Sequence, residues 1–115
     1  MSIYSFKVAL KHRKSLWRKI EIREEQTLGQ FDRIIREAFD FEQHDHLSEF
    51  FREKVWSATG LGEIEPGGLG NGSRKKIIDL RLNIGDKLEY IYDFGDSIIC
   101  LIELKDKYEV EDGSN

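Results

Sequence analysis

Alternation between apolar and polar positions predicts two strands at the start of the chain. Every second residue from Tyr4 to Leu10 is apolar, and the residues between them are small or polar. This period of two is typical of a strand with one buried face. The alternation returns over residues 16–22, after the polar and cationic connection 11–15. Two neighbouring strands joined in this way predict an N-terminal β-hairpin.

An amphipathic helix is predicted next. Thr27 and Gln30 have the spacing of a capping box, in which each residue satisfies a backbone N–H of the other. Apolar residues then recur at helical spacing: Leu28, Phe31, Ile35, Ala38 and Phe39. Charged residues fall largely on the other side: Asp32, Arg33, Arg36 and Glu37. The apolar stripe of such a helix must cover a sheet.

The middle of the chain has weaker periodicity. Residues 46–56 fit a short helix nearly as well as a strand, and we favour the strand. Residues 60–73 contain six of the ten glycines, so we expect a flexible loop there. A short segment over residues 77–82 leads into the last part of the chain.

The last part predicts a C-terminal β-hairpin. Two β-rich runs within residues 88–104 flank the acidic turn from Asp93 to Asp96. We expect Gly95 to supply a positive φ in this turn and the two aspartates to bond its backbone. Beyond Tyr108 the chain is acidic, and we expect it to fray.

These elements together predict an α+β fold. The order is hairpin, helix, further strands and hairpin, and residues 1–115 are enough for a single domain. The economical arrangement is one helix packed over one face of a mixed sheet, in a β-grasp-like manner. The content of 39% hydrophobic and 35% charged residues is typical of a folded protein with a highly charged surface.

Cysteine usage and the N-terminus bear on the compartment. Cys100 is the only cysteine, so no internal disulfide forms, and the reducing cytoplasm is the expected location. The first residues alternate as a strand does and contain no long apolar run, so we expect neither a signal peptide nor a membrane span.

Charge is distributed unevenly along the chain. Residues 1–23 carry seven Lys or Arg against one acid, whereas residues 93–115 carry seven acids against two lysines. The two ends either neighbour each other in the sheet and balance, or form a basic binding face. The second alternative points to nucleic acid, because cations hold phosphates and an exposed aromatic residue stacks on a base. The candidate residues of that patch are Lys11, Arg13, Lys14, Trp17 and Arg18.

Catalytic and metal-binding patterns are weak. His44, Asp45, His46 and Glu49 supply metal-ligand types, but no second cluster completes a site, so we expect no metal and no cofactor. Cys100 lies in an apolar strand, where a thiol is hidden, and no Ser-His-Asp arrangement is present. The glycines of residues 60–73 lack the Gly-Lys-Ser/Thr of a phosphate loop. We therefore expect no enzymatic activity.

An ordered set of short segments resembles the plasmid pRiA4b ORF-3-like family. The segments are Ile3–Val8, Leu16–Ile20, Thr27-Leu28, Asp45–Leu47 with Phe50, and Gly85–Leu88 leading to Tyr92–Asp96. The resemblance implies a compact α+β domain of prokaryotic cytosolic proteins, some of them carried on plasmids or other mobile elements, and it implies no specific activity. Members often have a Trp shortly after the acidic turn, where this chain has Ser97-Ile98-Ile99.

Three functional hypotheses follow. The first is a non-enzymatic accessory or interaction domain with a protein partner. The second is a nucleic-acid-binding accessory protein of a plasmid or transposon that uses the N-terminal hairpin. The third is a small metal-dependent enzyme that uses His46, Asp93 and Asp96. The candidate binding residues are Lys11, Arg13, Lys14, Trp17, Arg18, His46, Tyr92, Asp93 and Asp96.

Overall fold

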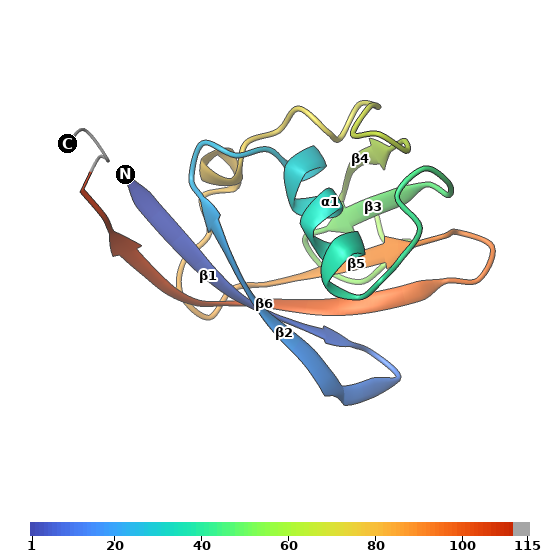
Figure 1. The fold of residues 1–115 in the computed structure, drawn as a ribbon, viewed down its shortest axis with the longest axis horizontal. Helices are drawn as coiled ribbons and strands as arrows, with labels where there is room; N and C mark the ends of the chain where they lie inside the picture. Colours follow the sequence, from blue (N-terminus) through green and yellow to red (C-terminus); the bar gives the residue numbers. More distant parts are fainter. Residues whose placement is uncertain (112–115) are drawn as a thin grey trace.

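A computed structural model describes residues 1–111 as one six-stranded sheet with one α-helix (Figure 1). The elements in chain order are β1 (Ser2–Leu10), β2 (Arg13–Arg23), α1 (Leu28–Ala38), β3 (Ser48–Phe51), β4 (Gly60–Ile64), the 3₁₀ helix η1 (Ile77–Leu80), β5 (Lys87–Tyr92) and β6 (Ile98–Glu109). The α+β class predicted from the sequence is confirmed.

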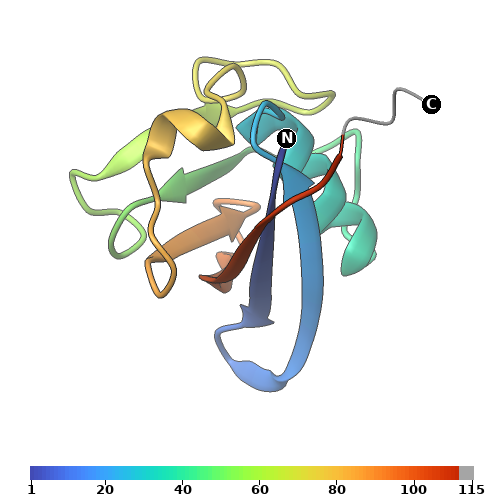
Figure 2. The same ribbon diagram turned by 90° about the vertical axis from the view of Figure 1, so that its left-hand side faces the viewer.

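The sheet has the strand order β2-β1-β6-β5-β3-β4, and all of these neighbours pair antiparallel. The prediction of a mixed sheet is therefore wrong, because a mixed sheet needs at least one parallel pair. The strands at the two ends of the chain, β1 and β6, lie side by side at the centre (Figures 1 and 2). This pairing places Lys7, the only charged residue of β1, opposite Glu103 of β6.

Helix α1 begins with the predicted capping box. The Thr27 hydroxyl accepts a bond from the Gln30 N–H at 3.2 Å, and the Gln30 side-chain oxygen accepts one from the Thr27 N–H at 2.9 Å. Two further N–H groups of the first turn, those of Leu28 and Gly29, donate to carbonyls of residues 75 and 73. These bonds satisfy the amides that a helix start leaves unpaired.

The core lies between α1 and one face of the sheet. Rings from β1, α1, β3 and β5 follow one another at centroid distances of 4.8–5.2 Å: Phe6, Phe31, Phe50 and Tyr90. The side chains of Phe31 and Ile35 on the helix are fully buried, as the helical spacing predicts. None of the helices described in residues 1–111 is long and apolar enough to cross a bilayer.

The glycine-rich segment contains a strand. Residues 60–64 form β4 and pair with β3, so the prediction of a loop across residues 60–73 is wrong for this part. The glycines allow backbones to approach closely. A Cβ on Gly72 would lie 2.0 Å from the Gly62 carbonyl oxygen, and one on Gly70 would lie 2.5 Å from the Glu63 oxygen. Such contacts exclude any larger residue, and loop mobility is not the reason for glycine here.

Strand β6 extends further than the sequence predicts. Glu109 pairs with Ser2, and the Val110 N–H donates to the Met1 carbonyl at 2.9 Å, so fraying does not begin after Tyr108. The remainder of the acidic tail, residues 112–115, lies outside the described residues. The ambiguous run 46–56 forms strand β3 in its first half and turns in its second.

Candidate functional site

The structure brings together three of the predicted candidates, His46, Tyr92 and Asp93, at one corner of the sheet. The His46 Nδ1 atom lies 3.5 Å from the Asp93 Oδ1 atom, and the His46 ring meets the Tyr92 ring edge-on at 5.6 Å. Both His46 (φ 70°) and Asp93 (φ 61°) have left-handed backbone conformations. Non-glycine residues adopt this conformation only where their surroundings enforce it.

Asp93 organises the turn between β5 and β6. Its Oδ1 atom accepts bonds from the N–H groups of Gly95 at 3.1 Å and Asp96 at 3.4 Å. The positive φ angles of this turn occur at Asp93 and Ser97, and Gly95 does not supply one. The Asp93 backbone therefore takes the positive φ expected of a glycine, and its Oδ1 atom bonds the turn backbone.

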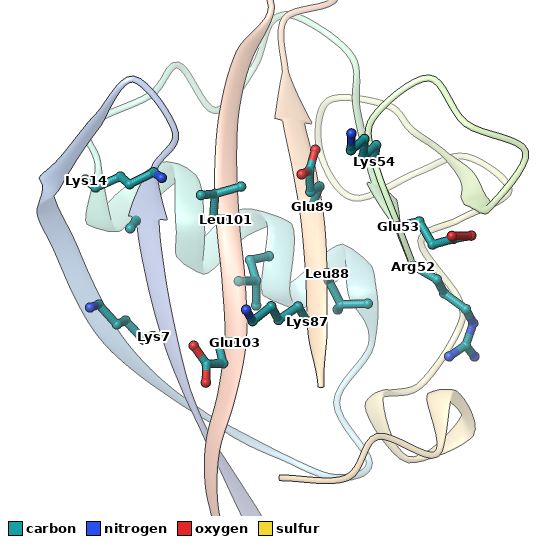
Figure 3. A pocket seen from close by; sticks show the side chains of 12 residues that line it. Lys7, Lys14, Arg52, Glu53, Lys54, Lys87, Leu88, Glu89, Leu101 and Glu103 are labelled. Carbon is teal, nitrogen blue, oxygen red and sulfur yellow. The ribbon is translucent and has the colours of Figure 1, made fainter. Parts of the chain in front are cut away.

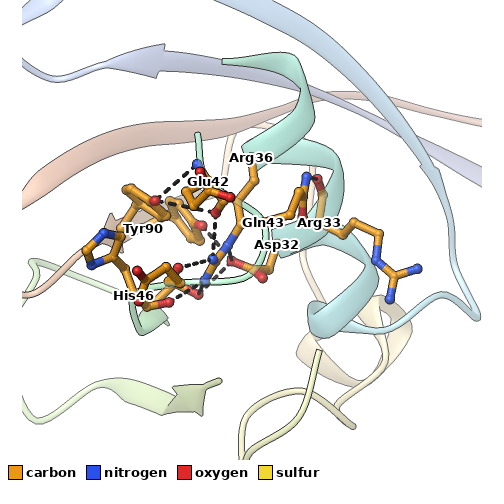
Figure 4. Close-up of polar contacts among 10 residues, drawn as sticks. Asp32, Arg33, Arg36, Glu42, Gln43, His46 and Tyr90 are labelled. Atoms are coloured by element: carbon orange, nitrogen blue, oxygen red, sulfur yellow. Dashed lines mark hydrogen bonds and ion pairs between the residues drawn. The ribbon is translucent and has the colours of Figure 1, made fainter. Parts of the chain in front are cut away.

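A buried polar network behind this corner fixes its position (Figure 4). The Asp32 Oδ1 atom accepts three bonds, from Arg36 Nε at 3.1 Å, Ser48 Oγ at 2.6 Å and Tyr90 Oη at 2.6 Å. All four residues are 0–2% exposed. Burial, and then the neighbouring Asp32 carboxylate, raise the pKa of Tyr90 well above its ordinary value.

The guanidinium of Arg36 joins this network to the connection between α1 and β3. It donates to the carbonyl oxygens of Glu42, Asp45 and His46 at 2.8–2.9 Å, and it lies 4.9 Å from the Tyr92 ring centroid. Burial alone would lower the pKa of Arg36, but Asp32 and Tyr90 together outweigh it through their charges and hydrogen bonds and raise that pKa. The network therefore positions His46 and has no exposed group of its own.

Sequence reasoning missed this network. It assigned Asp32 and Arg36 to the charged side of α1, whereas the structure buries both. Their spacing of four residues allows an ion pair on one helix face, and that spacing was the available signal. Periodicity alone does not distinguish a solvated pair from a buried one.

The opposite face of the sheet has no helix over it in residues 1–111 and forms a shallow groove (Figures 1 and 3). Pairing aligns Ala9, Leu101 and Glu89 in one row across β1, β6 and β5. A second row aligns Lys7, Glu103 and Lys87 across the same strands. The groove has a volume of about 460 Å³. It combines the apolar side chains of Ala9 and Leu101 with charged side chains from both rows.

Cations outnumber carboxylates around this open-face groove. The five cations are Lys7, Lys14, Arg52, Lys54 and Lys87, and the three acids are Glu53, Glu89 and Glu103. Two acids have partners within the chain, because Glu89 accepts a bond from the Val55 N–H at 3.0 Å and Glu103 lies 3.5 Å from the Lys105 ammonium. Within residues 1–111, none of the four groove lysines has a carboxylate within 4.0 Å. The groove thus has an excess of positive charge.

Both tryptophans of the chain flank this open face. Trp17 pairs with Ala9 from the edge strand β2, is 46% exposed, and has the Lys7 ammonium 5.0 Å from its ring centroid. Trp56 is 60% exposed, has a φ of 68°, and meets the rings of Phe51 and Phe94 edge-on. Exposed tryptophans are enriched at interfaces, because they bury a large area when a partner binds.

The predicted basic patch is divided between the two faces. Lys14 lines the open-face groove, whereas Arg18 pairs with Val8 and lies over the Phe39 ring on the helix-covered face. Arg13 pairs with the core residue Leu10, and the Lys11 N–H donates to the Ile99 carbonyl. Sequence reasoning missed the other groove cations because three separate segments contribute them. Within residues 1–111, no group of three His, Cys, Asp or Glu side chains is arranged to hold a metal ion.

Comparisons with known proteins give a family and a fold. The sequence matches the family described as plasmid pRiA4b ORF-3-like protein over residues 2–115. A crystal structure of a protein of unknown function from Methanosarcina mazei Go1 is similar, with a TM-score of 0.75 and 24% identity. The match covers 99% of this chain and 65% of that one, and at this identity it shows a shared fold. No curated protein matches.

Proposed function

The chain belongs to the plasmid pRiA4b ORF-3-like family, and we propose that it is a non-enzymatic interaction domain that binds an acidic peptide segment of a partner protein in its open-face groove. The observation that supports this proposal is the groove itself, with an apolar floor, four lysines without an ion-pair partner among residues 1–111, and an exposed tryptophan on either side.

The chemistry of the groove favours a peptide with both apolar and acidic side chains. An apolar side chain covers the row that contains Ala9 and Leu101, and that contact provides hydrophobic stabilisation. Acidic side chains on the same peptide approach Lys14, Lys54 and Lys87, whose charges steer a complementary partner. The two exposed tryptophans lie where a bound segment would cross the rims of the open face.

Single-stranded nucleic acid is the second candidate. Trp17 beside Lys7 is the kind of pair that stacks on a base and holds a phosphate. The carboxylates of Glu89 and Glu103 lie in the middle of the groove, however, and would repel a continuous phosphate backbone. The net charge of −4 opposes a polyanion with one charge per nucleotide more than it opposes a peptide in which acidic residues alternate with apolar ones, so we favour the peptide.

The proposed compartment is the cytoplasm, where the unpaired Cys100 stays reduced. A role as an accessory to a plasmid or other mobile element remains part of the proposal through the family alone.

A peptide-display selection tests the groove. Random linear peptides on phage are selected on the wild-type protein and counter-selected on Leu101→Glu, which places a charge in the floor. Leu69→Glu is the matched control, because it introduces the same charge at an exposed leucine outside the groove. The selected peptides are expected to combine acidic and apolar residues. A synthetic copy should bind Leu101→Glu at least about tenfold more weakly than it binds wild type or Leu69→Glu.

A second groove variant, Lys87→Glu, repeats the test at an exposed position, where a folding defect is less of a concern than at Leu101. Circular dichroism and thermal melting verify that each variant is folded. Peptides that bind all variants equally would contradict the groove as the site. Tight binding of oligothymidylate at physiological ionic strength, lost in Lys87→Glu, would instead support the nucleic-acid candidate.

A further inference from the structure

The backbone of strand β2 has one unpaired edge. Strand β2 is the last strand on its side of the sheet and pairs only with β1. The Glu24 N–H donates to the Ser2 carbonyl in continuation of this pairing. In an antiparallel pair, the backbone N–H and C=O groups of successive residues point alternately toward and away from the partner strand. Those of the even-numbered residues of β2 point toward β1. The N–H and C=O groups of Trp17, Lys19 and Glu21 therefore point away from the sheet.

Few of the outward backbone groups of β2 have a hydrogen-bond partner within the described chain. At the end of β2, the Arg23 N–H donates to the Gln26 side-chain oxygen at 2.8 Å, and the Arg23 carbonyl accepts a bond from the Gln26 N–H at 3.0 Å. The Trp17 carbonyl accepts a bond from the Arg18 guanidinium at 3.0 Å. Within residues 1–111, the outward groups of Lys19 and Glu21 and the N–H of Trp17 have no such partner. The unpaired stretch spans five residues, enough to hydrogen-bond one short extended segment.

The other edge of the sheet is closed by the chain itself. Beyond β4, the Gly72 N–H donates to the Glu63 carbonyl at 3.0 Å, and the Glu65 N–H donates to the Leu69 carbonyl at 2.7 Å. Residues 65–73 thus cover the β4 edge, whereas nothing described covers the β2 edge. An uncovered edge strand is a template for pairing with another chain.

The charges along β2 select the occupant. Five exposed cations lie on this strand: Arg13, Lys14, Arg18, Lys19 and Arg23. Its only acid, Glu21, already accepts a hydrogen bond from the Tyr108 hydroxyl and lies 4.0 Å from the Lys19 ammonium. Pairing with a second copy of β2 would place cations opposite cations, which is destabilising. An acidic strand removes that repulsion.

We propose that the β2 edge accepts an extended acidic segment of a partner protein as an additional strand of the sheet. Backbone hydrogen bonds to residues 17–21 hold the segment, and the cations of β2 favour an acidic segment over a basic one. This surface recognises backbone groups and charge, whereas the open-face groove recognises side chains. The two sites share Lys14 and Trp17, and loss of binding on N-methylation of the peptide backbone distinguishes the edge from the groove.

The test uses a defined probe, the end-blocked peptide Val-Glu-Val-Glu-Val-Glu-Val, titrated into ¹⁵N-labelled protein. The amide resonances of Trp17, Lys19 and Glu21 are expected to shift. A peptide with the same sequence and alternate amides N-methylated should bind at least about tenfold more weakly, because it keeps the charge and loses the backbone donors. A peptide with Lys in place of Glu should not bind.

Two variants of one position provide the matched control. Lys19→Pro removes the outward N–H at a place where an edge strand tolerates proline, and should weaken binding at least about tenfold. Lys19→Ala keeps the N–H and should bind more tightly than Lys19→Pro does. Leu101→Glu, which alters the groove, should leave this binding unchanged.

Three results would overturn the proposal. These are equal binding of the methylated and unmethylated peptides, equal binding by Lys19→Pro and Lys19→Ala, and peptide-induced shifts confined to the groove residues. Self-association of the protein that Lys19→Pro abolishes would assign the edge to a second copy instead.

Discussion

The two faces of the sheet differ in how their polar groups are satisfied. On the helix-covered face, Asp32, Arg36 and Tyr90 are buried, and no buried side-chain nitrogen or oxygen in residues 1–111 lacks a hydrogen-bond partner. On the open face, lysines surround an apolar row and have no carboxylate within 4.0 Å in the described chain. The buried network satisfies its own hydrogen bonds. The open face, by contrast, exposes charged groups and apolar surface that a partner can contact.

The largest effect is expected from breaking the buried network. Arg36→Ala removes the cation and leaves the Asp32 carboxylate buried without it, which should cost about 3–5 kcal/mol of unfolding free energy. Urea denaturation followed by circular dichroism measures this loss. Arg33→Ala, at an exposed position of the same helix, should change the stability by less than about 0.5 kcal/mol. A loss below about 1 kcal/mol in Arg36→Ala would show that water replaces the guanidinium there.

Two adjacent residues of β6 compare the faces directly. Ile102 lies on the helix-covered face and is 1% exposed, whereas Leu101 lies half-buried on the open face. Ile102→Ala should cost about 2–5 kcal/mol because it leaves a cavity, and Leu101→Ala should cost about 1 kcal/mol or less because solvent fills the space. Equal losses in urea melts would mean that the open face is also packed as a core.

The smallest effect concerns Cys100, whose thiol points into the core. Burial raises its pKa from 9.0 to about 12. The unfolded chain therefore releases this proton at lower pH than the folded protein, so this contribution to stability is full below about pH 9 and decreases as the pH rises toward 12. Between pH 9 and 10 the decrease should be about 1 kcal/mol.

Cys100→Ala should be less stable than wild type at pH 7, and its stability should decline less steeply over this alkaline range. Parallel urea melts at several pH values measure both slopes. Equal slopes would show that other groups cause the alkaline loss. Burial also raises the pKa of Tyr90, so tyrosine ionisation adds to the decline in both proteins at higher pH.

The sequence predicted those features that depend on residues close together in the chain. The capping box of Thr27 and Gln30 and the buried stripe of Phe31 and Ile35 follow from spacing within one helix, and both are present. The family resemblance also held over nearly the whole chain. Local spacing determines such features because the residues involved meet in any fold that contains the helix.

Features that depend on distant residues were not predictable in the same way. Nothing near Arg36 indicates that the carbonyls of residues 42–46 will surround it, and nothing near Lys14 indicates that Lys54 and Lys87 will share its groove. The glycines of residues 60–73 were misleading, because close backbone contact and flexibility produce the same composition. Of the predicted binding residues, His46, Tyr92 and Asp93 gather at one corner, and the Asp93 Oδ1 atom already bonds the turn backbone.

The central position of β6 determines when the groove can exist. β6 alone joins β2 and β1 to β5, β3 and β4, and its side chains supply Leu101 and Glu103 to the groove floor. It is also the last strand in the chain, and its contact between Glu109 and Ser2 spans 107 positions. A nascent chain that lacks β6 contains two unconnected pieces of sheet, and contacts at such separation form slowly. Assembly of the groove thus requires that β6 has already paired with both β1 and β5.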